Sequence, residues 1–161
     1  MRLAYTNDFN ETDIVEIPAN RHIQKNFTLG ELANDEAPES VKFISTPRSR
    51  KFMSMVQEFR NWYGAPINVT SNYRTYNYNL KCGGSKNSLH LDGLALDFRA
   101  IGHTNSKRAT VRAKWLEICK KYGEIGGINY YTHGYHICIG EEKFGNKTFT
   151  TRDYRGRQGD W

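Results

Sequence analysis

The most informative stretch of the chain lies just past its midpoint and reads Ser88-Leu89-His90-Leu91-Asp92-Gly93-Leu94-Ala95-Leu96-Asp97. From Gly93 to Ala100, small or polar residues alternate with apolar ones, and this period of two predicts a β-strand. One face of the strand then holds Gly93, Ala95, Asp97 and Arg99, and the other holds Leu94, Leu96 and Phe98. We therefore expect a strand with one apolar face and one face that presents Asp97.

His90 and Asp97 are seven positions apart, so on a straight strand their side chains would point to opposite faces. The Asp92-Gly93 pair between them is typical of a turn, and a turn breaks this parity. Both side chains can then face one point in space. Gly93 and Ala95, on the Asp97 face, are small and leave a hollow where a ligand or an ion fits against the sheet.

A third polar residue joins this pair from a neighbouring strand. The segments Ile128–Tyr131 and Tyr135–Ile139 are typical of two strands joined in a hairpin, and His136 lies on the second. Two imidazoles and one carboxylate with an open fourth position form the pattern of a catalytic zinc site. From these residues alone, the alternative is a hydrogen-bonded pair in the core and a histidine on the surface.

Apolar residues at helical spacing predict two long helices. The first has Thr46 as its N-cap and Pro47 at its first position, and it ends at Gly64. The second runs from about Ser106 to Tyr122. Shorter elements are expected at Thr12–Pro18 (an edge strand), Thr28–Glu31 (a capping box before a short helix) and Ile67–Thr70 (a strand). This order predicts an α+β fold with a small antiparallel sheet flanked by helices.

Composition narrows the class of protein. The chain has 161 residues, a net charge of +6 and 38% hydrophobic residues, and no apolar run reaches the roughly 20 residues of a membrane span.

Met1–Asn10 lacks the apolar stretch of a signal peptide, so we expect synthesis in the cytoplasm. Cys82, Cys119 and Cys138 form no C-x-x-C pair, which fits a reducing compartment. We expect one domain over residues 1–161 that acts as a monomer.

The positive charge also suggests a nucleic-acid-binding protein, with Tyr73, Tyr76 and Tyr78 as aromatic residues that stack on bases. However, the Lys and Arg residues are dispersed, and no predicted helix carries a continuous basic face. We therefore expect no nucleic-acid partner. The charge instead indicates a general attraction to an anionic polymer or surface.

The spacing Ser88-x-His90-x-x-Gly93-x-Ala95-x-Asp97 resembles the S-x-H-x-x-G-x-A-x-D signature of the zinc D-alanyl-D-alanine carboxypeptidases and related phage endolysins. This family of peptidoglycan metallopeptidases shares its fold with the Hedgehog signalling domain. Further segments are similar to those of its members: Asn26–Leu32, Tyr63–Ile67, Thr70–Arg74 and Gly126–Cys138. The resemblance covers about residues 26–140, implies the Hedgehog/DD-peptidase fold, and leaves residues 141–161 as a polar tail.

The resemblance implies a role for each matched residue. His90, Asp97 and His136 match the zinc ligands, so Zn2+ is the implied cofactor. Arg74 matches an arginine that binds the substrate carboxylate or polarises the scissile carbonyl, and a guanidinium suits either task. Ser88 matches the serine of the motif, which orients a ligand and is expected to contact the substrate.

At two positions the chain departs from the family's pattern. In several members a carboxylate three residues before the last zinc histidine acts as the general base, and here that position holds His133. The imidazole pKa suits this task near neutral pH, so His133 is the expected base, and a turn histidine in solvent is the alternative. Cys138 stands where the usual pattern has an aspartate. Three roles are open for Cys138. It takes the place of the aspartate beside the metal ligands, it serves as an additional soft metal ligand, or it indicates that catalytic activity has been lost.

The resemblance predicts a zinc-dependent peptidase that hydrolyses peptide bonds of bacterial peptidoglycan, in stem peptides or in crosslinks. The implied activity is that of a D,D- or L,D-carboxypeptidase or endopeptidase. A phage endolysin is the expected type, made in the cytoplasm and acting at the cell wall. The alternative is a catalytically silent module of the same fold that binds zinc or the wall. Cys138 and His133 favour this alternative, and the retention of Arg74 and Ser88 opposes it.

Overall fold

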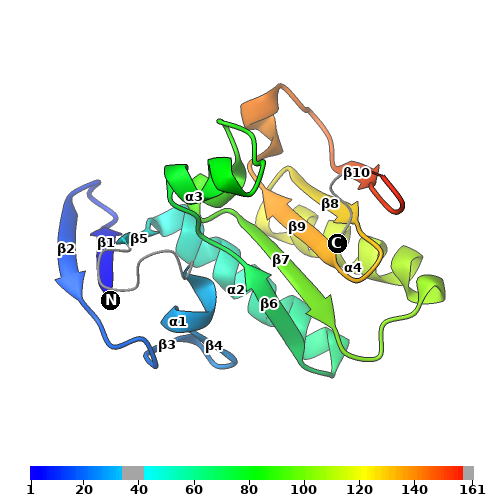
Figure 1. The fold of residues 1–161 in the computed structure, drawn as a ribbon, viewed down its shortest axis with the longest axis horizontal. Helices are drawn as coiled ribbons and strands as arrows, with labels where there is room; N and C mark the ends of the chain where they lie inside the picture. The colour runs from blue at the N-terminus through cyan, green and yellow to red at the C-terminus, as the bar shows by residue number, and fades with distance from the viewer. Residues whose placement is uncertain (34–41, 158–161) are drawn as a thin grey trace.

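The computed structural model describes residues 1–33 and 42–157 and confirms the α+β fold expected from the sequence (Figure 1). Its main sheet has five strands in the order β10-β8-β9-β7-β6. The strands are β6 (Ile67–Ser71), β7 (Ala95–Ala100), β8 (Gly126–Tyr130), β9 (Tyr135–Ile139) and β10 (Thr150–Asp153). Neighbours in this sheet run antiparallel, except for β10 and β8, which run parallel.

Both predicted long helices are confirmed, as α2 (Pro47–Tyr63) and α4 (Arg108–Tyr122). The Thr46 side chain accepts a hydrogen bond from the backbone N–H of Ser49, which caps the start of α2. Gly64 ends α2 in the left-handed conformation at φ 74°. In the described part of the chain, no helix has both the length and the apolar character needed to cross a membrane.

The core lies between the main sheet and these two helices, which are behind the sheet in Figure 1. Phe98, on the apolar face of β7, packs against Phe59 of α2 with ring centres 5.7 Å apart. Phe59 in turn meets Trp115 of α4 edge-on at 6.1 Å. Because Phe98 points toward the helices, its strand neighbour Asp97 points to the opposite, open face of the sheet.

The N-terminal part forms a separate three-stranded sheet in the order β2-β1-β5. Its strands are β1 (Arg2–Thr6), β2 (Thr12–Glu16) and β5 (Lys42–Ser45). The predicted edge strand is therefore present as β2. A hairpin of β3 (His22–Gln24) and β4 (Phe27–Thr28) leads into α1 (Leu29–Leu32), where the predicted capping box between Thr28 and Glu31 is formed.

Some structure was not predicted from the sequence. The polar segment after β6 contains α3 (Tyr76–Lys81), and no pattern in the sequence predicted β1. The expected polar tail contains the short 3₁₀ helix η3 (Glu141–Phe144) and then β10, which extends the main sheet beside β8. Two other 3₁₀ turns are η1 (Leu89–Asp92) and η2 (Asn105–Lys107). Residues 158–161 of the expected tail and 34–41 of the expected family-like core lie outside the described residues.

Candidate metal centre

His90 reaches the open face of the sheet from η1, the turn that directly precedes β7. Ser88 caps this turn, because its Oγ accepts a hydrogen bond from the backbone N–H of His90 at 3.3 Å. Gly93 ends the turn in the left-handed conformation at φ 67°, which a residue with a Cβ adopts only at a cost. Because of this turn, the side chains of His90 and Asp97 reach the same face of the sheet, as predicted.

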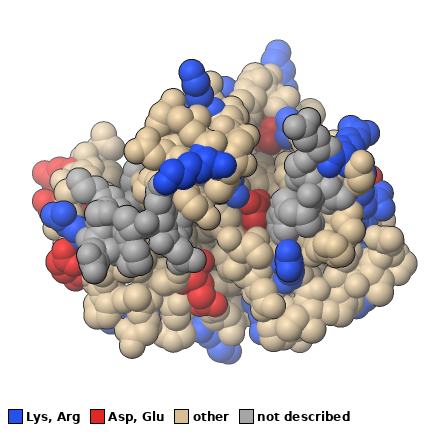
Figure 2. Space-filling view, in the orientation of Figure 1, with Lys and Arg blue, Asp and Glu red and all other residues tan. Residues whose placement is uncertain are grey.

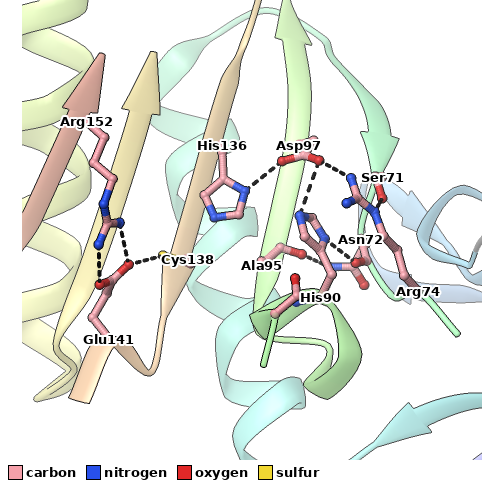
Figure 3. Close-up of polar contacts among 11 residues, drawn as sticks. Ser71, Asn72, Arg74, His90, Ala95, Asp97, His136, Cys138, Glu141 and Arg152 are labelled. Atoms are coloured by element: carbon pink, nitrogen blue, oxygen red, sulfur yellow. Dashed lines mark hydrogen bonds and ion pairs between the residues drawn. The ribbon is translucent and has the colours of Figure 1, made fainter. Parts of the chain in front are cut away.

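Asp97 lies between two histidines (Figure 3). The pairing of β7 with β9 puts Asp97 directly opposite His136, and Asp97 Oδ1 lies 2.7 Å from His136 Nδ1. The other carboxylate oxygen, Oδ2, lies 3.2 Å from His90 Nε2. One donor atom from each of the three residues lies within 4.8 Å of the other two. We call these three residues the metal cluster.

Asn72 fixes the orientation of the His90 ring. His90 Nδ1 lies 2.6 Å from the backbone carbonyl oxygen of Asn72. Because a carbonyl oxygen only accepts, Nδ1 carries the proton and Nε2 keeps its lone pair for the metal cluster. Asn72 is buried and is itself held in place, since its Nδ2 donates to the backbone carbonyl of Ala95 at 2.8 Å. This arrangement selects the tautomer that a metal ligand needs.

Burial and charge set the protonation states of the metal cluster. Burial raises the pKa of Asp97, but the contacts of its carboxylate with His90 and His136 outweigh burial and hold that pKa well below its ordinary value. Burial lowers the pKa of His90, although the Asp97 carboxylate opposes this effect. Near neutral pH the metal cluster therefore offers an ionised carboxylate beside a neutral His90 imidazole.

Arg74 contacts the metal cluster from the β6 side. Its Nη2 donates to Asp97 Oδ2 at 2.5 Å, and its Nε donates to Ser71 Oγ at 2.7 Å. An irregularity in the pairing of β6 with β7 falls between Val69 and Ser71, just before this contact. The guanidinium thus balances part of the charge of a buried carboxylate and is held in a fixed orientation.

The donor set of the metal cluster fits zinc. Zn2+ binds imidazole nitrogen and carboxylate oxygen at about 2.0–2.2 Å, and tetrahedral coordination then places neighbouring donors roughly 3.3 Å apart. The 3.2 Å between Asp97 Oδ2 and His90 Nε2 is close to this spacing, whereas Asp97 Oδ1 and His136 Nδ1, 2.7 Å apart, lie at hydrogen-bond distance. Mg2+ and Ca2+ prefer shells of oxygen donors, which two imidazoles do not provide.

The metal cluster opens into a cavity of about 550 Å3. We call it the metal cavity. Its lining is formed by Thr70, Ser71, Arg74, Cys82, Gly83, Gly84, Ser85, Ser88, His90, Asp97, Arg99, Asn129, Tyr131, His136 and Tyr154. The structure therefore brings together the three predicted metal ligands with Arg74 and Ser88.

Three residues of the metal cavity were missed in the sequence. Asn129 lies opposite His136 on β8, and its Oδ1 is buried without a hydrogen-bond partner among the described residues. Tyr131 and Tyr154 stack with their ring centres 5.5 Å apart. Burial, assisted by the charge of Asp97, raises the pKa of Tyr131 to about 12, so its hydroxyl keeps its proton. The pairing register of the predicted hairpin would have placed Asn129 opposite His136. No pattern in the expected tail predicted that Tyr154 lines the cavity.

His133 is not brought to the metal cluster. It lies in the exposed turn between β8 and β9, which the backbone N–H of Tyr131 closes with the carbonyl of Gly134 at 3.1 Å, and it does not line the metal cavity. An offset of three positions from His136 also reverses the face to which a strand residue points. The role of His133 as a base stays a prediction.

Cys138 shares the open sheet face with His136, but its thiol bonds to Glu141 instead of joining the metal cluster (Figure 3). Cys138 Sγ lies 3.4 Å from Glu141 Oε1, and Arg152 donates to that same oxygen at 3.2 Å. Burial, followed by the Glu141 charge, raises the pKa of the Cys138 thiol well above its ordinary value. A protonated thiol is a poor metal ligand, so the geometry does not favour Cys138 as an extra ligand.

The chain was compared with protein families, curated proteins and solved structures. The sequence model of the peptidase M15 family matches residues 25–137, a range that contains the whole metal cluster. Among solved structures, the L-Ala D-Glu endopeptidase ChiX of Serratia marcescens is similar at 15% identity and a TM-score of 0.44, over 60% of this chain and 83% of that one. No curated protein matches the chain significantly.

Proposed function

The chain belongs to the peptidase M15 family, and from its metal cluster we propose that it is a zinc-dependent peptidase of bacterial peptidoglycan. The observation that carries this proposal is the convergence of His90, Asp97 and His136 in the metal cavity. Bound there, zinc would supply a Lewis acid that polarises a carbonyl and lowers the pKa of a water molecule.

The residues around the metal cluster keep its ligands ready. His90 would bind through Nε2, because its Nδ1 donates to the carbonyl of Asn72. Ser88 holds the turn that carries His90, and it also lines the metal cavity, where a substrate meets it. Asp97 stays ionised, so the cluster needs no deprotonation at the carboxylate before it takes up a cation.

We propose that Arg74 interacts with negative charge on the substrate. A guanidinium has five N–H donors, and the bonds to Ser71 and Asp97 hold it at the edge of the metal cavity. We assign it to the substrate carboxylate or to the scissile carbonyl, where a fixed positive charge stabilises the negative charge that develops during hydrolysis.

His133 is the proposed proton-transfer group because it occupies the position, three residues before His136, where several family members carry a carboxylate. His133 is exposed and is not among the lining residues of the metal cavity, and both facts favour a second candidate function. In that case the protein is a silent module that binds zinc or the wall without cutting it. Asp97 is the only carboxylate among the described lining residues, and this also favours the silent module.

A phage endolysin is the proposed type, acting at the cell wall on stem peptides or crosslinks as a carboxypeptidase or an endopeptidase. The net charge of +6 supports this assignment, because a basic protein is attracted to an anionic wall. The same charge is compatible with a bacterial enzyme.

The direct test is to incubate zinc-loaded protein with purified peptidoglycan and to identify new peptide termini by mass spectrometry. The enzyme should release new amino and carboxyl termini, and an Asp97→Ala variant should release none. Circular dichroism would verify that the variant is folded. Binding to peptidoglycan without new termini would identify the silent module, and equal release by Asp97→Ala would exclude the metal cluster as the active site.

A further inference from the structure

A second cavity, of about 210 Å3, borders the metal cavity, and we infer that it is the subsite for an aliphatic substrate side chain larger than a methyl group. We call it the side cavity. Its lining shares Ser85, Ser88 and His136 with the lining of the metal cavity. The two spaces therefore meet beside a ligand of the metal cluster. This inference rests on the proposed peptidase function and adds a substrate class to it.

Part of the wall of the side cavity comes from the chain after β9. Glu141 and Phe144, on η3, and Arg152, on β10, line the cavity there. All three residues lie beyond residue 137, where the match to the peptidase family ends. The family pattern therefore does not describe this wall, and a substrate preference set by it belongs to this chain.

An ion pair links the two 3₁₀ helices that line the side cavity. Lys143 Nζ on η3 donates to Asp92 Oδ2 on η1 at 2.6 Å. The same two helices carry the apolar lining residues, Phe144 on η3 and Leu89 on η1. The relative position of these two side chains is thus restrained before a substrate binds, which reduces the entropy lost on binding.

The charged groups of the side cavity bond to each other. Arg152 donates to Glu141 Oε1 at 3.2 Å and to Glu141 Oε2 at 3.4 Å (Figure 3). Asn146 donates to Oε2 as well, at 2.6 Å. Among the described lining residues, Arg152 and Glu141 are the only Lys, Arg, Asp or Glu side chains, so their charges balance. A charged substrate group would lose its hydration in this cavity without gaining an unpaired partner.

The apolar surface of the side cavity is available for contact. The Phe144 side chain is large and 44% exposed, whereas Leu89 is buried against the core. Aliphatic carbons that cover the exposed ring remove apolar surface from water, which favours binding. A methyl group would leave most of the 210 Å3 unfilled and would lose these contacts. A side chain of three or four carbons makes more of them.

The test uses zinc-loaded protein and pairs of wall peptides that differ only in one side chain, that of alanine or leucine in the same configuration. One pair varies the residue before the scissile bond, and the other pair varies the residue after it. In one pair, wild type should hydrolyse the leucine peptide with a kcat/KM about tenfold or more above that of the alanine peptide. Phe144→Ala should reduce this ratio by about tenfold and leave the zinc content unchanged, and Phe144→Leu should keep part of the preference.

Phe9→Ala is the matched control, because Phe9 is 86% exposed and lines neither cavity. It should leave every ratio unchanged. If wild type showed no preference in either pair, or if the preference survived in Phe144→Ala, the subsite would be wrong and the peptidase function would stand.

If wild type hydrolysed none of the peptides, the proposed function would fail, and calorimetry with the intact leucine peptides would decide on the subsite. Weaker binding by Phe144→Ala than by wild type would support it. Equal affinity of the two proteins, including no binding by either, would reject it.

Discussion

His90 presents Nε2 to the metal cluster because its Nδ1 donates to the carbonyl of Asn72. The same residue depends on Ser88, which caps its turn, and on Gly93, which ends that turn with a positive φ. The site thus depends on short local contacts within the motif as much as on the three ligands themselves.

We predict that the folded protein binds one zinc ion per chain and that His90→Ala removes most of it. Loss of a direct ligand should weaken zinc binding by more than the tenfold to hundredfold typical of changes to the groups that support a ligand. Elemental analysis of dialysed protein measures the bound metal. His22→Ala is the control, because His22 is exposed in β3 and outside the metal cluster. Unchanged zinc in His90→Ala would remove this residue from the site.

At Cys138, we predict that Cys138→Asp destabilises the fold although an aspartate is the usual residue of the family there. The thiol lies 3.4 Å from the buried Glu141 carboxylate, so an aspartate would place two carboxylates together. The expected cost is about 3 kcal/mol or more. Cys138→Ser keeps a donor to Glu141 and should unfold close to the wild-type midpoint. Urea unfolding compares the two variants, and a wild-type midpoint for Cys138→Asp would contradict this prediction.

Among the secondary-structure elements, the loop after α3 shapes the metal cavity. Gly83, Gly84 and Ser85 line the cavity, and Asn79 on α3 holds the loop through a 2.8 Å hydrogen bond from its Nδ2 to the carbonyl of Ser85. A Cβ on Gly84 would overlap the Asn79 amide, whereas the backbone of Gly84 has no special conformation. The close approach of the loop to Asn79 therefore requires glycine at this position.

Gly84→Ala should raise the KM for a wall peptide by about tenfold while zinc content stays at the wild-type level, because the loop moves and the metal cluster does not. Gly102→Ala is the control for backbone strain in a loop: alanine is strained at the φ of +73° found there, but it meets no neighbouring atom and lies outside the metal cavity, so the KM should stay at the wild-type value. Steady-state kinetics and elemental analysis measure the two effects. Parallel loss of zinc in Gly84→Ala would show that the loop supports the metal cluster itself.

The sequence predicted the elements that have a local signal. The cap at Thr46, the stop at Gly64 and the turn before β7 each depend on one or two residues whose chemistry is specific. It did not predict β10, because that strand is short and is stabilised by its pairing with β8 rather than by its own pattern. The position of His133 depends on where β9 begins, and strand ends are set by the whole hairpin.

Across the whole molecule, charge is unevenly distributed. Residues 7–16, around β2, hold four acidic side chains and no Lys or Arg, and Figure 2 shows acidic residues gathered at that end. The rest of the chain therefore carries a larger positive charge than the net value of +6 indicates. The segment also precedes the part that matches the peptidase family, so the family-like region is the strongly basic one.

Ion pairs also connect distant parts of the fold. Glu124, just after α4, accepts hydrogen bonds from Arg48 at 2.5 Å and from Lys51 at 2.8 Å, both on α2. Burial raises the pKa of Glu124, but these two partners outweigh it and hold the pKa below its ordinary value of 4.5. An acid with a depressed folded-state pKa stabilises the fold above that ordinary value, and the contribution is lost as pH falls below it.

Glu124→Gln should therefore lower the free energy of unfolding by about 1 kcal/mol at pH 7, because Arg48 and Lys51 are partly exposed and screened. At pH 3 the difference from wild type should shrink, since the carboxyl is then increasingly protonated. Urea unfolding at both pH values measures the effect. Glu117→Gln, on the exposed surface of α4, should change little at either pH. If Glu124→Gln lowered the free energy of unfolding equally at pH 7 and pH 3, the predicted pH dependence would be wrong.

The central claim is that His90, Asp97 and His136 form one zinc site that supports peptide hydrolysis. The most direct measurement is a titration of metal-free protein with zinc, in which the rate of peptide release from peptidoglycan is recorded after each addition. We predict that the rate rises in proportion to zinc and stops rising at one ion per chain. A rate that is already maximal without zinc, or that remains zero beyond one ion per chain, would contradict the claim.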